Sequence, residues 1–162
     1  MTVNIQRFIK TVAISAILAF GTNAAVAATS PVMGTWELNT AKSTNEAKDP
    51  PKSETFIFAN SAKGVLVTTN ITAADGKQSK HTSDPALWDG VAHPVTDSSD
   101  HDSIVAKPVG ARMVKYSFMK AGAVVNSGTL AVSMDGTMLT IAGARSSAKG
   151  GKLYYNSVFD RK

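Results

Sequence analysis

The chain has 162 residues, with 17 basic and 12 acidic side chains and a formal net charge of +5. This length provides for one ordinary domain and is too short for two. The chain has no cysteine, which excludes disulfides, thiol nucleophiles, zinc–thiolate sites and a lipid-modified N-terminal cysteine.

The first 27 residues have the pattern of a secretory signal peptide. Arg7 and Lys10 form a basic start, and the apolar run 11–20 is of signal-peptide length and too short to span a bilayer. Residues 25–27, Ala-Val-Ala, match the small-residue cleavage pattern. The alternative is an uncleaved N-terminal anchor. We expect cleavage after Ala27, hence a signal peptide at 1–27 and a single domain at 28–162.

The predicted signal peptide also indicates the localisation of the protein. Two of the 17 basic side chains and none of the acidic ones lie within it, so the mature domain would have a net charge of +3. That charge excludes a strongly polycationic nucleic-acid binder. We expect a periplasmic or secreted protein of a Gram-negative bacterium, without stable membrane insertion and monomeric.

Short alternating runs rich in Val, Ile, Thr, Phe and Tyr recur at about ten-residue intervals after the signal peptide, which is typical of an all-β fold. A longer connection at 40–52 contains Pro50-Pro51 and one short helical turn. A polar run at 78–88 is an edge or bent strand at best, and 93–95 is a short segment. We expect full strands at 34–39, 53–59, 65–73, 103–107, 112–120, 124–133, 138–146 and 153–161.

Eight to ten strands joined in sequence by tight turns predict an antiparallel up-and-down meander. Asp-Gly pairs at 75–76, 89–90 and 135–136 favour such turns because a positive φ costs little there. Closing the meander into a barrel removes both of its edges. An open two-sheet sandwich is the competing architecture.

The first strand carries Gly34-Thr35-Trp36, which resembles the opening signature of lipocalins and their calycin relatives. In that family the tryptophan closes one end of the barrel and is covered by an arginine from late in the chain. The resemblance implies this plug for Gly34, Trp36 and Arg161, with Arg145 as the less favoured substitute.

A wider resemblance is to lipocalin-like secreted proteins of Gram-negative bacteria, a largely uncharacterised group. It covers nearly the whole chain after the signal peptide and implies a lipocalin-like barrel and an exported protein, with no agreed substrate. The segments that carry it are Gly34–Ser43, Pro51–Thr55, Asp89–Val95, Asp135–Thr140 and Phe159–Lys162.

The polar clusters of the sequence give little indication of a metal-binding or catalytic site. The segment 97–102 holds three aspartates and His101 and lacks the spacing of a calcium loop, so we interpret it as a solvated loop rather than a cation site. His81 and His93 also lack metal-ligand spacing. The sequence contains no nucleophile elbow and no phosphate-cradling loop. We therefore expect no enzyme, no cofactor and no metal.

The inside of the barrel is the remaining candidate site. Alternation places a set of apolar side chains on faces that can point inward, where they form either a solid core or a pocket for one small ligand. Trp88, His93 and Tyr116 are candidates for the polar contacts. The predicted cavity-lining residues are Phe56, Phe58, Val67, Trp88, His93, Val114, Tyr116, Phe118, Leu130 and Leu139.

Two hypotheses follow. The first is a non-catalytic protein that holds a small apolar or amphipathic molecule inside the barrel. The second is an interaction or inhibitor protein with a solid core, which binds an envelope partner through the loops 40–51 and 96–102. An enclosed cavity of about 300 Å³ or more, lined by the predicted apolar residues, would support the first hypothesis.

Overall fold

The computed structural model describes residues 30–46, 49–147 and 150–162 of the chain. The predicted signal peptide at 1–27 lies outside the described residues. Within these ranges no helix is long and apolar enough to cross a membrane. One turn of 3-10 helix, η2 (Thr40–Lys42), lies in the long connection where a helical turn is expected.

The other regular elements of the described chain are strands, and eight of them follow the predicted full strands to within two residues. The strands are β1 (Gly34–Leu38), β2 (Thr44–Asn45), β3 (Ser53–Ser61), β4 (Gly64–Thr72), β5 (Gln78–Thr82), β6 (Ala92–Pro94), β7 (Ser103–Pro108), β8 (Met113–Lys120), β9 (Ala123–Val132), β10 (Met138–Ser146) and β11 (Lys152–Arg161). The described residues form eleven strands rather than eight to ten, because the short strands β5 and β6 form in the segments expected to be edge or short pieces and β2 forms in the segment expected to be a connection.

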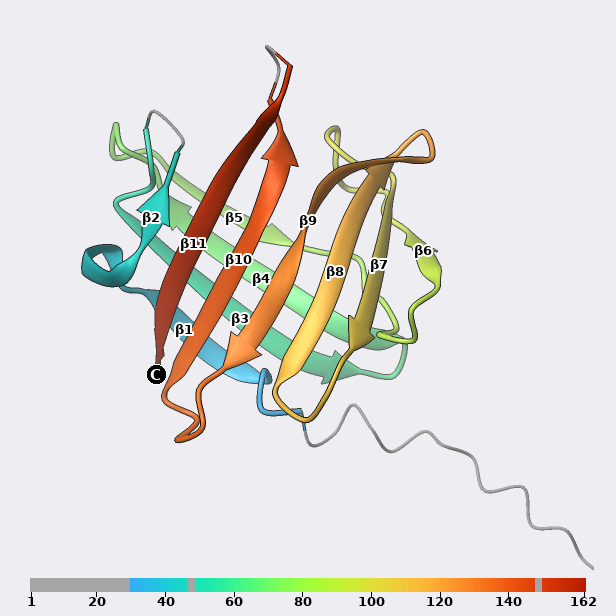
Figure 1. Ribbon diagram of the computed structural model, residues 1–162, viewed down its shortest axis with the longest axis horizontal. Helices are drawn as coiled ribbons and strands as arrows, with labels where there is room; N and C mark the ends of the chain where they lie inside the picture. The colour runs from blue at the N-terminus through green and yellow to red at the C-terminus, as the bar shows by residue number, and fades with distance from the viewer. Residues whose placement is uncertain (1–29, 47–48, 148–149) are drawn as a thin grey trace, which may run out of the picture.

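All strand pairs are antiparallel and most join neighbours in the chain. The sheet order is β5-β4-β3-β1-β11-β10-β9-β8-β7-β6, with β2 added to β11. The first strand therefore pairs with both β3 and the last strand, β11. In Figure 1 strands β8–β11 cross in front of β3–β5, so that the sheet curls back over itself. The all-β up-and-down fold expected from the sequence is confirmed.

The sheet has one seam. Within the described residues no backbone ladder joins β5 to β6, and side chains link the two edges instead. Asp84 Oδ2 accepts hydrogen bonds from the backbone N and from Oγ1 of Thr96, at 2.8 and 2.7 Å. His81 Nε2 lies 3.3 Å from Asp97 Oδ2. The pairing of β1 with β11 therefore joins the two halves of the curled sheet, and side-chain contacts bridge the seam between its edges.

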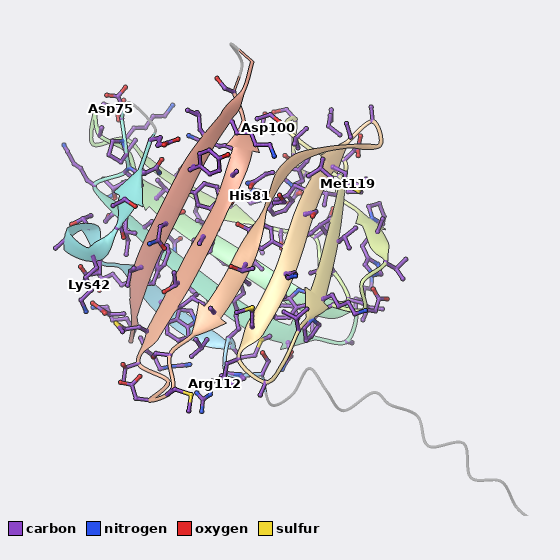
Figure 2. The ribbon with its side chains drawn as sticks, in the orientation of Figure 1. Lys42, Asp75, His81, Asp100, Arg112 and Met119 are labelled. Carbon is purple, nitrogen blue, oxygen red and sulfur yellow. The ribbon has the colours of Figure 1, made fainter. Side chains whose placement is uncertain are left out.

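The core fills one end of this barrel. Trp36, Leu139 and Phe159 are fully buried and pack with the buried residues near the paired ends of β8, β9, β10 and β11. Charged side chains such as Lys42, Asp75 and Arg112 lie at the periphery, in the connections between strands (Figure 2). Because one end is filled and the strands continue beyond it, the interior space lies toward the other end.

Candidate functional site: a cavity inside the barrel

A cavity of about 350 Å³ occupies the barrel interior. Eight of the ten predicted lining residues lie in its wall. Inward positions of at least five strands contribute, as the alternation of a β-strand requires. The eight are Phe56, Phe58, Val67, Trp88, Val114, Tyr116, Phe118 and Leu130.

Two predicted lining residues lie elsewhere. Leu139 points inward but is fully buried in the core beside Phe159, below the cavity. His93, in β6, is held by Asp89, whose Oδ1 lies 2.9 Å from Nε2 of the histidine. His93 pairs in register with Ile104, which lines the cavity, but His93 itself is not among the lining residues.

The inward residues of β8–β11 form three rows across the sheet. The row nearest the core runs through Val114, Leu130 and Ile141, which are apolar and buried, and ends at Ser157 on β11. The row farthest from it runs through Phe118, Asn126 and Arg145. The cavity therefore changes from an apolar floor to a polar mouth.

The middle row contains two tyrosines and two glycines in register. Tyr116 pairs with Gly128, Gly128 with Gly143, and Gly143 with Tyr155. The two phenol groups meet above the glycines, with their hydroxyl oxygens 2.5 Å apart. A Cβ atom at Gly128 would lie 2.8 Å from Tyr116 Oη, and one at Gly143 would lie 2.6 Å from Tyr155 Oη. The glycines thus provide the space that lets both rings lie along the wall.

The hydrogen bonds of this pair have a direction. Tyr155 donates its hydroxyl hydrogen to Asn126 Oδ1 over 2.6 Å, so in the tyrosine pair it accepts from Tyr116. Both hydroxyl hydrogens are then used, and Tyr116 Oη presents only lone pairs to an occupant. Burial, with the contact to Tyr155, raises the pKa of Tyr116 well above its usual range, so the Tyr116 phenol remains neutral.

Gly143→Ala is expected to lower the free energy of unfolding by about 1–3 kcal/mol, the usual cost of overpacking a filled interior. The added Cβ would lie 2.4 Å from the backbone oxygen of Ser127 as well as against Tyr155, so backbone and ring must both move. Urea unfolding measures the effect. Ala142→Ser, which adds one atom on the outward face of the same strand, is the control. Equal stabilities of the two variants would contradict the steric role of Gly143.

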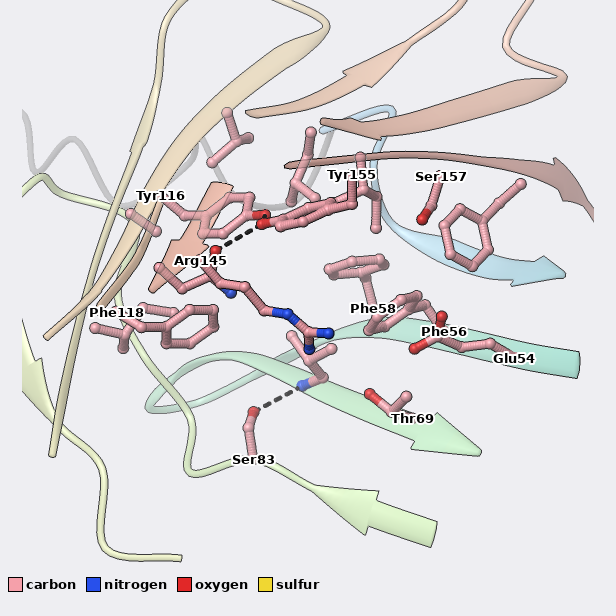
Figure 3. A pocket seen from close by; sticks show the side chains of 18 of the residues that line it. Glu54, Phe56, Phe58, Thr69, Ser83, Tyr116, Phe118, Arg145, Tyr155 and Ser157 are labelled. Atoms are coloured by element: carbon pink, nitrogen blue, oxygen red, sulfur yellow. Dashed lines mark hydrogen bonds between the residues drawn. The ribbon is translucent and has the colours of Figure 1, made fainter. Parts of the chain in front are cut away.

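Two charged side chains in the cavity wall have no partner among the residues that the structure describes. Glu54, on β3, is half-buried, and Arg145, on β10, is exposed at the mouth. Neither makes a hydrogen bond or an ion pair with another described residue. Burial raises the pKa of Glu54 to about 7. Figure 3 shows both side chains reaching into the space between the walls.

Two histidines at the mouth are already engaged. His101 packs on Phe118, with 4.4 Å between ring centroids, and its Nδ1 lies 3.0 Å from Ser98 Oγ. Burial lowers the pKa of His101, so the ring is neutral at neutral pH. His81 is held by Asp97, as described for the seam.

The aspartates of the loop 97–102 contact different partners rather than one another. Asp102 Oδ2 accepts a hydrogen bond of 2.7 Å from the backbone N of Ala121, which lowers the pKa of Asp102. Asp97 faces His81. In the part of the chain that the structure describes, no group of three or more His, Cys, Asp or Glu side chains is placed to hold a metal ion.

The closed end of the barrel has the plug arrangement implied by the lipocalin resemblance. The Arg161 guanidinium lies over Trp36, 4.0 Å from the ring centroid. Its nitrogens donate to the backbone oxygens of Pro31, Met33 and Gly136 at 2.6, 3.0 and 2.7 Å. Gly34 has a φ of +130°, and a Cβ there would lie 2.7 Å from Arg161 Nη1. A glycine is therefore required at this position on both counts.

The sequence did not predict most of the polar side chains that line the cavity. Glu54, Arg145 and Tyr155 line the cavity but were not among the predicted lining residues. Counting outward from the turn at 135–136 gives the strand register that aligns Gly128 with Gly143. The same count from the turn at 121–122 would pair Tyr116 with Ser127, because it misses the register shift between Phe118 and Met119 that brings Tyr116 opposite Gly128.

No protein-family model and no curated protein matches this chain. Among solved structures, the zebrafish ileal bile acid-binding protein complexed with cholic acid is similar over 82% of this chain and 100% of its own, at 13% identity and a TM-score of 0.50. The siderocalin Ex-FABP is similar over 82% of this chain and 75% of its own, at 10% identity and a TM-score of 0.38. At such identities the first likeness shows the fold alone, which is the antiparallel up-and-down β-fold expected from the sequence.

Proposed function

We propose that this protein is an exported, non-catalytic carrier that holds one small amphipathic molecule inside its barrel. The observation that carries the proposal is the cavity of about 350 Å³, with an apolar floor and a polar mouth. Small-molecule sites in proteins have this size and this combination of apolar walls with a few placed polar groups.

The chemistry of the wall supports an amphipathic rather than a purely apolar ligand. Phe56, Phe58 and Phe159 provide a cluster of rings, with centroid separations of 5.3 Å for Phe56–Phe159 and 5.8 Å for Phe56–Phe58. Arg145 and the acceptor-only Tyr116 lie farther along the wall. An apolar body against the rings leaves a polar head at the mouth. A bile acid-binding protein of the same fold type supports this use of the barrel.

The rival hypothesis was a solid-core interaction protein. It requires a filled barrel, and the cavity is at odds with that requirement. The loop 96–102 is partly occupied in linking the seam, since Thr96 and Asp97 contact Asp84 and His81. The carrier is therefore the function that the geometry supports best.

Export is part of the proposal and is supported by the sequence of residues 1–27. One experiment tests both parts: the full-length chain is expressed in a Gram-negative host, recovered from the periplasm and weighed by native mass spectrometry. We expect a chain that begins at Ala28 and a bound small molecule that is released on collisional activation. A full-length chain in that fraction would contradict export with cleavage. A bare chain that copurifies with another protein would favour the rival hypothesis.

A further inference from the structure

Two opposite charges without partners face the same cavity from different walls. Glu54 lies on β3 and Arg145 on β10, and two strands, β1 and β11, separate them in the sheet. No ion pair joins them among the described residues, although both reach into the same space (Figure 3). An occupant of the cavity therefore lies between a guanidinium and a carboxyl group.

The other titratable groups facing this space are satisfied within the protein. His81 is held by Asp97, and His101 by Ser98 and the Phe118 ring. The hydroxyl hydrogens of the tyrosine pair are used as well, which leaves Arg145 as the charged donor available to an acid group. Among the described residues, the charged groups of the wall that have no protein partner are thus one acid, Glu54, and one base, Arg145.

Complementarity then fixes the ligand's charge pattern. A half-buried carboxylate without a partner is desolvated at a cost, which an ammonium group from the ligand would offset. A guanidinium binds a carboxylate or phosphate with two parallel hydrogen bonds. A ligand with only one of these charges leaves the opposite group in the wall unpaired.

On the basis of the proposed function, we infer that the cavity selects a zwitterionic amphiphile. Its acid group binds Arg145, its ammonium group binds Glu54, and its apolar chain lies on the rings of Phe56, Phe58 and Phe159. Binding alone is involved, so no bond is formed or broken in the ligand.

The test uses four probes with ten-carbon chains and different heads: 2-aminodecanoate, decanoate, decylamine and 1-decanol. Their affinities are measured by calorimetry at pH 8, where the Glu54 carboxyl is ionised for the most part. We expect 2-aminodecanoate to bind about tenfold more tightly than either singly charged probe, because each of them forgoes one charged hydrogen bond.

Two variants test which residue of the cavity wall binds each charged group of the ligand. In Glu54→Gln, we expect 2-aminodecanoate to bind at most about twofold more tightly than decanoate, because the ammonium group no longer meets a carboxylate. In Arg145→Gln, we expect 2-aminodecanoate to bind at most about twofold more tightly than decylamine, because the acid group no longer meets a guanidinium. Glu37→Gln, on the outward face of β1, is the matched control and should leave both ratios unchanged.

The outcomes separate this inference from the carrier proposal. Equal binding of 2-aminodecanoate and decanoate, or ratios that neither variant changes, would overturn the zwitterion inference while the carrier remains. Failure of all four probes, 1-decanol included, would overturn the carrier and with it the inference that depends on it.

Discussion

Trp36→Ala is expected to lower the free energy of unfolding by about 3–5 kcal/mol, the range for removing a fully buried aromatic side chain. Trp36 has no exposed surface, and its Nε1 donates a 2.8 Å hydrogen bond to the backbone oxygen of Val32. The substitution leaves a void in the closed end and removes the ring beneath the Arg161 guanidinium. Urea unfolding followed by far-ultraviolet circular dichroism gives the stability without depending on tryptophan fluorescence.

Trp88→Ala is the matched control for this experiment. Trp88 is half-buried in the cavity wall and meets Phe58 edge-on, with 6.3 Å between ring centroids. Its removal enlarges a space that already exists, so the expected loss of stability is smaller. If Trp88→Ala proved as destabilising as Trp36→Ala, the closed end would not be the main packing unit of the barrel.

Raising the pH from 4.5 to above 7 is expected to lower the free energy of unfolding by about 2–3 kcal/mol through Glu54 alone. Its carboxyl has the ordinary pKa of 4.5 in the unfolded chain, and burial raises it to about 7 in the folded protein. Between these values the folded state binds more protons than the unfolded state. Stability from this group is therefore fully present below pH 4.5 and is lost as the pH rises through 7.

Glu54→Gln isolates that contribution, because glutamine has nearly the same shape and does not titrate. We expect the variant to match the wild type near pH 4.5 and to exceed it in stability by about 2–3 kcal/mol at pH 8. Chemical unfolding of both proteins across this range provides the difference, with Glu37→Gln as the control at an exposed carboxyl. A constant difference across the range would show that the Glu54 carboxyl has the same pKa in the folded and unfolded states.

Much of this fold was predictable because hydrophobic alternation and turn residues are local signals. The strand 138–146 was predicted with its observed bounds, Met138–Ser146, since Asp135-Gly136 marks its start and its apolar residues alternate. The pairing of β1 with β3 and β11 was less accessible. It joins residues far apart in the chain, and only the lipocalin resemblance, through Trp36 and Arg161, indicated that the terminal strands meet.

The cavity was predictable in its apolar part and not in its polar part. Phe56, Phe58 and Val67 follow from alternation, because inward faces are apolar in most barrels. Glu54 shares that face, but a charged residue at a strand's start is usually exposed, so its sequence position indicated solvent. Arg145 was considered for the plug, but its place in the row with Phe118 and Asn126 depends on the register of two successive hairpins, one of which has a register shift at Phe118.

The contact between the two terminal strands also has a kinetic consequence. Arg161 Nη1 reaches the backbone oxygen of Met33 across 128 residues of sequence, whereas the hairpins from β7 to β11 form from neighbouring segments. Closing so long a loop costs more chain entropy than closing a hairpin, and contacts of this kind slow folding. We expect the hairpins to form first and β1 to join last, so that burial of the Trp36 ring reports the final step in folding.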